Sequence, residues 1–255
     1  MDLSTEIISR YLIRREVFDI SCHNTVSSTN TLLKEAALAG APEGSVIIAE
    51  SQTSGRGRMG RSFYSPDGSG LYMSMLIRPD PDTVGKITTM AAVAVCRAIE
   101  RTLDIKPDIK WVNDILLNGK KVCGILAEAA TGGEGVMFVV LGIGVNVYMP
   151  SEGFTEDIAD IAGALTETIR PDLRSRIAAA ILDEFWEIYS KKENIAMEYN
   201  KRCIVPGNRV NVIKNGVAKP ALALSLDEVC RLVVRYDNGE TETLESGEIS
   251  IKIDK

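Results

Sequence analysis

The chain has 255 residues, of which 45% are hydrophobic and 25% charged, so it has the composition of a globular protein with one sizeable core. Its 29 basic and 35 acidic side chains give a formal charge of −6, which disfavours general nucleic-acid binding. No stretch approaches the roughly 20 apolar residues of a membrane span, and the first residues lack a signal-peptide pattern. Five cysteines without a C-x-x-C pair argue against a disulfide framework and a zinc site, and fit a reducing cytoplasm.

The N-terminal part predicts a helix, a short strand and a second helix. Apolar spacing favours a helix over residues 3–16 and a strand over 17–20. Ser28-Thr29-Asn30 then precedes a helix over 31–40, which Gly40 would close. Two interpretations of Ser28-Thr29-Asn30 stay open, because these side chains can either cap the helix or bind a ligand.

A loop rich in glycine and arginine lies between predicted strands 46–50 and 71–78, and reads Gln-Thr-Ser-Gly-Arg-Gly-Arg-Met-Gly-Arg over residues 52–61. Its guanidinium groups can close around an anion, and we expect them to gain partners only when an anion is present. One alternative is a surface loop without a ligand. Another is the dinucleotide fingerprint G-x-G-x-x-G, which is weak here because turn residues and no helix follow it.

The middle of the chain predicts a long helix and three strands. Asp82 or Thr83 can cap a helix that extends to Leu103. Three strands follow, and the first two are joined by the hairpin signal Asn118-Gly119. These strands cover residues 108–117, 121–130 and 136–147.

Several polar residues interrupt these otherwise apolar strands: Lys110, Asn113, Asp114, Lys121 and Asn146. Polar groups on a buried sheet are matched to one another or to a ligand, and the alternative is a sheet face open to water. The single histidine, His23, has no adjacent carboxylate, so we expect it to be structural and expect no Ser-His-Asp or Cys-His catalytic group.

The C-terminal part predicts two more helices, over 158–168 and 171–192, and then a change of character. From residue 206 the sequence consists of short strands separated by glycine-containing turns, which suggests a small SH3-like barrel. The expected strands are residues 209–214, 221–226, 231–236, 241–244 and 247–253, with turns at Asn215-Gly216 and Asp237-Asn238-Gly239. We therefore expect two domains, 1–205 and 206–255.

Five motifs together resemble those of biotin protein ligase in order and approximate spacing. They are Ser28-Thr29-Asn30, the loop Gly55 to Arg61, Lys110-Trp111-Val112-Asn113-Asp114, Lys121-Val122-Cys123-Gly124-Ile125-Leu126 and Gly142-Ile143-Gly144-Val145-Asn146. The resemblance covers nearly the whole chain, which looks like the short form without an N-terminal DNA-binding domain. The family usually has proline at the position of Val112, and Gly-Ile-Asp where this chain has Ser225-Leu226-Asp227.

The resemblance implies an α+β fold with a mixed, largely antiparallel central sheet and flanking helices, of the class II aminoacyl-tRNA synthetase and biotin ligase type, followed by the SH3-like barrel. It also implies a cytoplasmic enzyme that uses biotin, ATP and Mg²⁺. Biotin's carboxylate would attack the α-phosphorus of ATP to give biotinyl-5′-AMP, and a lysine of a biotin carboxyl carrier domain would then accept biotin. The resemblance allows a homodimer, and we expect neither specific DNA binding nor membrane association.

The resemblance also assigns roles to individual residues. Lys121 and Arg58 would be catalytic, with Lys121 between the biotin carboxylate and the α-phosphate, and Asp114 would orient Mg²⁺ or Lys121. The residues implied for biotin are Ser28, Thr29, Asn30, Gln52, Arg56, Gly57, Arg58, Lys121 and Gly124. Those implied for ATP are Arg58, Arg61, Phe63, Asn113, Lys121 and Asn146. The glycine-arginine loop would be mobile without ligand and become an ordered lid over the adenylate.

Two other functions remain to be distinguished. A lipoate or octanoate transferase shares the fold, but a fatty acyl chain would favour apolar walls over Ser28-Thr29-Asn30, Gln52 and the arginines. A non-catalytic binder, either a biotin-responsive regulator or a nucleic-acid binder, is disfavoured by the acidic pI of about 5.1 and by Lys121. ATP-dependent incorporation of biotin into a carrier domain separates the ligase from both.

Overall fold

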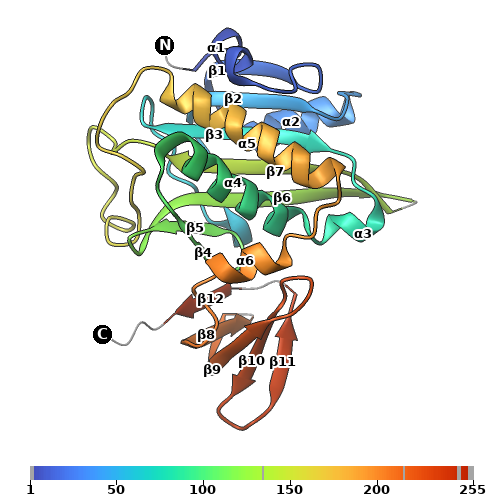
Figure 1. Ribbon diagram of the computed structural model, residues 1–255, viewed down its shortest axis with the longest axis vertical. Helices are drawn as coiled ribbons and strands as arrows, with labels where there is room; N and C mark the ends of the chain where they lie inside the picture. Colours follow the sequence, from blue (N-terminus) through green and yellow to red (C-terminus); the bar gives the residue numbers. More distant parts are fainter. Residues whose placement is uncertain (1–2, 134, 215, 246–247, 252–255) are drawn as a thin grey trace.

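The computed structural model describes residues 3–133, 135–214, 216–245 and 248–251. It contains a seven-stranded sheet in the order β1-β2-β3-β7-β6-β5-β4 and a five-stranded sheet in the order β11-β10-β9-β8-β12 (Figure 1). Only β1 and β2 pair in parallel in the large sheet, so the expected mixed, largely antiparallel α+β fold is confirmed.

The large sheet is formed by β1 Asp19–Val26, β2 Ser45–Gln52, β3 Gly70–Ile77, β4 Asp108–Lys110, β5 Asp114–Leu117, β6 Lys120–Gly132 and β7 Gly135–Asn146. The helices are α1 Thr5–Tyr11, α2 Thr29–Leu38, the 3₁₀ turn η1 Arg58–Gly60, α3 Pro81–Val84, α4 Ile87–Leu103, α5 Leu173–Ser190 and α6 Ala196–Arg202. The small sheet is formed by β8 Arg209–Lys214, β9 Val217–Leu226, β10 Leu232–Tyr236, β11 Thr241–Leu244 and β12 Glu248–Ile251.

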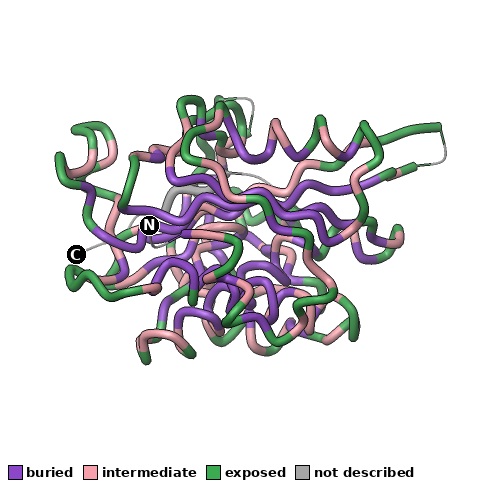
Figure 2. The backbone as a smooth tube through the Cα atoms, turned by 90° about the horizontal axis from the view of Figure 1, so that it is seen from above, coloured by how far each residue is buried: buried purple, intermediate pink, exposed green. Residues whose placement is uncertain are grey.

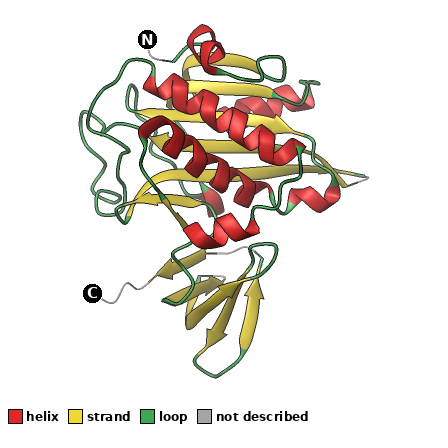
Figure 3. Cartoon of the chain, in the orientation of Figure 1, coloured by secondary structure: helices red, strands yellow, loops and turns green. Residues whose placement is uncertain are grey.

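The two faces of the large sheet are covered differently. Alternate side chains of a strand point to opposite faces, and the apolar set from β3 and β7 that includes Met73, Leu141 and Ile143 packs in the main core with α4 and α5. Figure 3 shows these two helices side by side in front of the sheet. On the opposite face α2 packs over Ile47, Leu76, Phe138 and Val140. Because this second cluster is small, α2 and its apolar contacts cover only part of that face of the sheet.

The smaller sheet lies beyond α6, at the end of the molecule away from the N-terminus (Figure 1). Its strands pair antiparallel in the manner of a small SH3-like barrel. One apolar cluster contains residues of both sheets, among them Ile109 and Trp111 of the large-sheet part and Val210 and Leu232 of the small sheet. The division at residue 205 therefore stays a prediction. Figure 2 shows the buried segments concentrated along the strands and the inner sides of the helices.

The turn and helix predictions in the middle of the chain had mixed outcomes. Asn118 and Gly119 both have positive φ, of 52° and 77°, as a type I′ hairpin turn requires. The predicted caps Asp82 and Thr83 were wrong: the Asp80 side chain caps the short helix α3, and α4 begins separately after Gly85 and Lys86. Proline at the first position of α3 favours this earlier start.

Three other predicted elements have different boundaries. The strand predicted over 17–20 lies further along the chain, as β1, although its polar residues obscure the pattern. The single strand predicted over 108–117 is two strands, β4 and β5, which pair with each other around a turn at 111–113. The helix predicted over 158–168 was wrong, since these residues form turns and extended segments, and α6 was missed.

The other predicted elements agree apart from their ends. α2 begins two residues earlier than predicted, and α5 lies within 171–192. Asn215, Gly247 and residues 252–253 of the predicted C-terminal turn and strand lie outside the described residues. None of the described helices is both long and apolar enough to cross a membrane.

A buried ion pair connects α5 to the strand that leads to the glycine-arginine loop. Arg174 Nη1 lies 2.5 Å from Glu50 Oε2, and the two side chains are 6% and 11% exposed. Removing one partner would leave the other charge buried without compensation. We expect Arg174→Met to lower the free energy of unfolding in urea by about 3–5 kcal/mol.

Arg209→Met is the matched control, because Arg209 pairs with Asp237 where both side chains are about half exposed, at 48% and 54%. Exposed pairs of this kind contribute about 0–1 kcal/mol. Equal losses of unfolding free energy in the two variants would contradict the assignment of Arg174 and Glu50 as a structural link.

Candidate functional site

The floor of the candidate site is bare strand backbone on the face that α2 leaves open. On β7 the positions facing α2 change from Phe138 and Val140 to Gly142 and Gly144. A Cβ atom on Gly142 would lie 2.1 Å from Asn30 Oδ1, and one on Gly144 would lie 2.6 Å from Cε1 of Phe63. These glycines therefore allow side chains from other segments to pack directly on the sheet.

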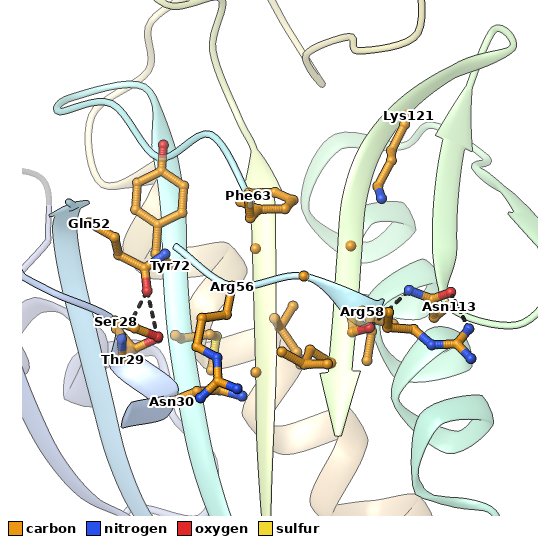
Figure 4. A pocket seen from close by; sticks show the side chains of 18 residues that line it. Ser28, Thr29, Asn30, Gln52, Arg56, Arg58, Phe63, Tyr72, Asn113 and Lys121 are labelled. Atoms are coloured by element: carbon orange, nitrogen blue, oxygen red, sulfur yellow. Dashed lines mark hydrogen bonds between the residues drawn. The ribbon is translucent and has the colours of Figure 1, made fainter. Parts of the chain in front are cut away.

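One cavity lies over this floor, and all nine residues predicted to bind biotin line it. The lining residues are Ser28, Thr29, Asn30, Gln52, Arg56, Gly57, Arg58, Phe63, Tyr72, Met73, Asn113, Lys121, Gly124, Ile125, Leu126, Gly142, Ile143 and Gly144. They come from the start of α2, the end of β2, the glycine-arginine loop and the segment after it, the β4–β5 turn, and strands β3, β6 and β7 (Figure 4). The free volume inside the lining is about 50 Å³, which holds a few waters at about 10–15 Å³ each.

The first polar group of the cavity is built at the start of α2. Ser28 is the N-cap residue, yet in the described chain its side chain makes no capping hydrogen bond. Instead the backbone N–H and hydroxyl of Thr29 donate to Gln52 Oε1, at 2.9 and 3.2 Å, and Gln52 Nε2 donates to Ser65 Oγ at 2.9 Å. The Ser28 side chain therefore does not cap α2, and ligand binding by Ser28-Thr29-Asn30 stays a prediction.

Asn30 lies at the centre of a second polar group, together with Ser74 and Glu128. Ser74 Oγ is 2.6 Å from Asn30 Oδ1, and Asn30 Nδ2 donates to Glu128 Oε2 at 2.8 Å. The other oxygen of Glu128, Oε1, pairs with Arg56 Nη2 at 2.8 Å. Asn30 and Ser74 are buried. Neither Ser74 nor Glu128 was predicted. The sequence offered one signal for each, namely a polar residue within an otherwise apolar strand, at a position that points to the same face as its alternate neighbours.

Lys121 reaches the same face because of a bulge in β6. On the neighbouring strand β5, Ile115 pairs with Cys123 and the next residue, Leu116, pairs with Lys121. Val122 is therefore an extra residue in β6 that has no partner on β5. Cys123 packs in the main core, whereas Lys121 Cε lies 3.2 Å from the position of a Cβ on Gly124. Without the bulge, residues three apart would point to opposite faces.

A carboxylate holds the Lys121 ammonium. Lys121 Nζ lies 2.7 Å from Asp114 Oδ1, in an ion pair whose side chains are 33% and 23% exposed. The approach lacks the angle of a hydrogen bond, so Asp114 Oδ1 is buried without a hydrogen-bond donor. Of the two roles expected for Asp114, this geometry supports the orientation of Lys121.

Arg58 is held at the same end of the cavity by Asn113. Its Nη1 donates to Asn113 Oδ1 at 3.0 Å, and Asn113 Nδ2 donates to the carbonyl of Ile125 at 3.0 Å. Burial lowers the pKa of the Arg58 guanidinium, and the nearby Asp114 carboxylate partly opposes this shift. The group nevertheless stays charged at neutral pH, because an arginine titrates far above that range.

The glycine-arginine loop itself forms a small hairpin. Arg56 and Ser62 make a β-bridge, and Gly57 N–H donates to the Arg61 carbonyl at 2.7 Å. The expectation that the arginines gain partners only with an anion was wrong for Arg56 and Arg58, which pair with Glu128 and Asn113. An arriving anion must therefore compete with these partners.

Phe63 divides the cavity into two halves. Its ring lies against Gly124 and Gly144 and meets Tyr72 edge to face, with ring centroids 6.3 Å apart. Figure 4 shows Gln52 and Tyr72 on one side of the ring and Lys121 on the other. We call the half with the uncharged side chains of Thr29, Asn30 and Gln52 the neutral half; the charge of Arg56 there is offset by its ion pair with Glu128. The half with Lys121 and Arg58 is the cationic half.

Two predicted ATP residues lie outside this lining. Arg61 is exposed in the loop, and Asn146 Nδ2 donates to the Gly163 carbonyl at 3.1 Å, so it supports the segment that pairs with Lys121. Their contact with a nucleotide stays a prediction. In the described residues there is no group of three or more His, Cys, Asp or Glu side chains that could hold a metal ion.

Known proteins resemble this chain in sequence and in fold. The sequence profile of the Biotin/lipoate A/B protein ligase family matches residues 23–146. A bifunctional ligase/repressor BirA from Bacillus spizizenii is 42% identical over 167 residues, which cover 65% of this chain and 49% of that protein. The chain thus spans about half the length of that relative.

Two longer matches cover most of both chains. A biotin--[acetyl-CoA-carboxylase] ligase from Mycobacterium tuberculosis is 32% identical over 236 residues, or 87% of this chain and 85% of that protein. A biotin protein ligase from Aquifex aeolicus, solved in complex with biotin and ATP, superposes with a TM-score of 0.74 and 25% identity over 92% of this chain and 98% of that one. Since identity at this level extends over nearly the full length of a relative, the chain belongs to the biotin protein ligase family.

Proposed function

We propose that the protein is an ATP-dependent ligase that activates biotin to biotinyl-5′-AMP and then transfers biotin to a lysine of a biotin carboxyl carrier domain. The observation that carries this proposal is one cavity that joins a neutral hydrogen-bonding half to a cationic half across Phe63. Biotin and ATP have this combination of chemistry, with a neutral ureido ring at one end and phosphates at the other.

The neutral half suits the ureido ring of biotin. A ureido group offers two N–H donors and one carbonyl acceptor. Thr29, Asn30 and Gln52 present side-chain groups of both kinds. Hydrogen bonds to Ser74 and Glu128 fix the Asn30 amide in place. A small number of well-placed polar groups around an apolar ligand is enough to give specificity. A fatty acyl chain offers no donor or acceptor to these groups, which disfavours lipoate or octanoate as the substrate.

In the first half-reaction the biotin carboxylate oxygen attacks the α-phosphorus of ATP, forming a P–O bond while the bond to the leaving pyrophosphate breaks. Both reactants are anions, so positive charge must bring them together. Lys121 is a compact ammonium that Asp114 holds in place, and Arg58 adds a second cation from the loop. No side-chain nucleophile is needed.

Magnesium is part of this proposal. The described residues offer one nearby carboxylate, Asp114, whose buried Oδ1 has no hydrogen bond but already faces the Lys121 ammonium. A single carboxylate suits an ion that keeps its waters and is held largely by substrate phosphates. Mg²⁺ bound with ATP would supply charge neutralisation, with the phosphates as its main ligands and Asp114 as the candidate carboxylate nearest to Lys121.

In the second half-reaction the neutral amine of a carrier lysine attacks the acyl carbon of the mixed anhydride, forming an amide and releasing AMP. We propose a biotin carboxyl carrier domain as the acceptor because the Mycobacterium tuberculosis relative is a biotin--[acetyl-CoA-carboxylase] ligase.

We also propose a homodimer. In the described part of the chain no strand pairs with residues 126–132 of β6 on the side away from β7, so this edge can accept another strand.

The direct test of the first half-reaction is exchange of labelled pyrophosphate into ATP. We expect exchange that requires biotin and is not supported by lipoate or octanoate. Exchange in the absence of biotin, or with lipoate in its place, would contradict the assignment of the cavity.

Arg58 should also retain the adenylate, because its bond to Asn113 fastens the loop beside Lys121. A hydrogen bond to a charged group contributes about 1.5–3 kcal/mol, so we expect Arg58→Gly to speed biotinyl-5′-AMP release by roughly tenfold to a hundredfold. Labelling of lysines on a bystander protein should rise with it. Met59→Gly controls for loop flexibility, because Met59 is exposed and already has φ of 56°. Equal release rates in the two variants would refute the fastening role of Arg58.

DNA binding is the remaining alternative, since the Bacillus relative is named a ligase/repressor. With a formal charge of −6, this chain should bind a DNA duplex weakly and lose that binding as salt rises. Filter binding or anisotropy at 50 and 200 mM salt measures this. Tight, sequence-dependent binding at the higher concentration would show that the protein also acts as a regulator.

A further inference from the structure

The turn between β9 and β10 in the small sheet is unusually well fixed. Asp227 Oδ1 accepts the backbone N–H groups of Val229 and Arg231, at 3.0 and 2.8 Å, and Asp227 Oδ2 accepts Arg231 Nε at 2.6 Å. Cys230, which lies in this turn, has φ of 64°, a conformation that non-glycine residues rarely adopt. Asp227 is the aspartate of the segment Ser225-Leu226-Asp227, to which the ligase chemistry assigns no role.

This turn presents one carbonyl group to the catalytic part of the chain. The indole Nε1 of Trp111 donates to the Cys230 carbonyl at 2.9 Å, and both residues are 3% exposed. An indole has a single donor, and a buried donor left without an acceptor costs free energy. The orientation of the Trp111 ring is therefore set by the small sheet.

Trp111 begins the β4–β5 turn, which ends at Asn113. The Tyr199 hydroxyl on α6 donates to the Val112 carbonyl at 3.1 Å, so the middle of this turn is fixed as well. Asn113 then accepts the hydrogen bond from Arg58 described above. Small sheet, Trp111, Asn113 and Arg58 thus form one continuous series of contacts.

A second cavity confirms how near the turn lies to the site. This cavity has a volume of about 600 Å³, and its lining includes Arg58, Val112 and Ile125 together with Val229, Cys230 and Arg231. The β9–β10 turn thus lies on the Arg58 side of the molecule. The neutral half of the first cavity, formed by Thr29, Asn30 and Gln52, has no residue in this lining.

We infer that Trp111 is a positioning residue for the use of ATP. Through the bond between Trp111 and the Cys230 carbonyl, the small C-terminal sheet holds Asn113 and Arg58 in place. The inference rests on the proposed ligase function. It predicts a selective defect: loss of the Trp111–Cys230 bond should weaken the use of ATP and loosen the loop, and should leave biotin recognition unchanged.

The test compares three variants with the full-length wild-type protein. Trp111→Phe removes the donor and keeps an aromatic ring. Asp227→Ala loosens the turn that carries the acceptor and leaves Trp111 intact. Trp186→Phe is the control, because Trp186 is the other of the chain's two tryptophans and packs on Phe18 and Tyr189 from α5. KM for ATP and for biotin is measured by pyrophosphate exchange, and trypsin cleavage at loop arginines is measured without ligand.

We expect Trp111→Phe and Asp227→Ala each to raise the KM for ATP about threefold to tenfold, the range for one lost hydrogen bond, with the KM for biotin within twofold of wild type. Both should speed loop cleavage, and Trp111→Phe combined with Asn113→Ala should be less than additive. Trp186→Phe should match wild type.

Unchanged ATP KM and loop cleavage in both variants would overturn the inference, as would equal increases in both KM values. A purely structural role would lower the unfolding temperature without separating the two substrates. An inactive wild-type protein would instead refute the ligase function, and the loop-cleavage result would still decide whether Trp111 positions Arg58.

Discussion

Lys121→Ala should reduce biotinyl-5′-AMP formation by about 10²–10³-fold, the cost of removing one preorganised donor from a site of developing charge. The ammonium lies at the cationic end of the cavity, where Asp114 holds it at 2.7 Å. Its backbone bonds to Ile161 and Gly163 do not involve the side chain, so the segment that covers this end should stay in place. The rate is measured by pyrophosphate exchange and by single-turnover adenylate formation.

Lys120→Ala is the matched control, because the neighbouring Lys120 side chain is exposed and donates to the carbonyl of Asp160. It should retain the wild-type rate. Adenylate formation by Lys121→Ala at a rate within twofold of wild type would remove Lys121 from its catalytic role, provided that both variants unfold cooperatively at the wild-type temperature.

Gly142→Ala should abolish most of the biotin affinity although no side chain that touches biotin is replaced. The new methyl group would lie 2.1 Å from Asn30 Oδ1, so the amide must leave its position between Ser74 and Glu128. Loss of these buried hydrogen bonds costs about 1–3 kcal/mol. We therefore expect the Kd for biotin, measured by calorimetry, to rise roughly fivefold to a hundredfold with little change in the affinity for ATP.

Gly133→Ala is the control on the same hairpin, since a Cβ there would meet nothing within 4 Å. A double-mutant cycle strengthens the test: once Asn30 is alanine, Gly142→Ala should have little further effect on biotin binding. Unchanged biotin affinity in Gly142→Ala alone would show that Asn30 is not part of the biotin site.

Much of the site could be predicted from the sequence because its residues cluster in short motifs. The nine residues expected to bind biotin line one cavity, although they come from segments up to 96 positions apart, from Ser28 to Gly124. The regular strands and helices were also predictable, since β3, β7, α4 and α5 are long and strongly apolar. The sequence pattern thus predicts secondary structure best in segments that are buried along most of their length.

The residues that were missed depend on tertiary geometry. Glu128 resembles an ordinary exposed strand residue, and only the folded chain places its carboxylate between Asn30 and Arg56. The bulge at Val122 that turns Lys121 toward the site has no marker in composition. Likewise the turn at 111–113 interrupts what reads as one strand, because Trp111 is held by a carbonyl 119 residues away.

The most direct test of the central proposal is incorporation of labelled biotin into a purified biotin carboxyl carrier domain, with mass analysis of the modified residue and quantitation of nucleotide products. We predict ATP-dependent labelling of a single carrier lysine, with one AMP and one pyrophosphate formed for each biotin attached. Absence of labelling by the intact, folded protein, or transfer of lipoate or octanoate in preference to biotin, would contradict it.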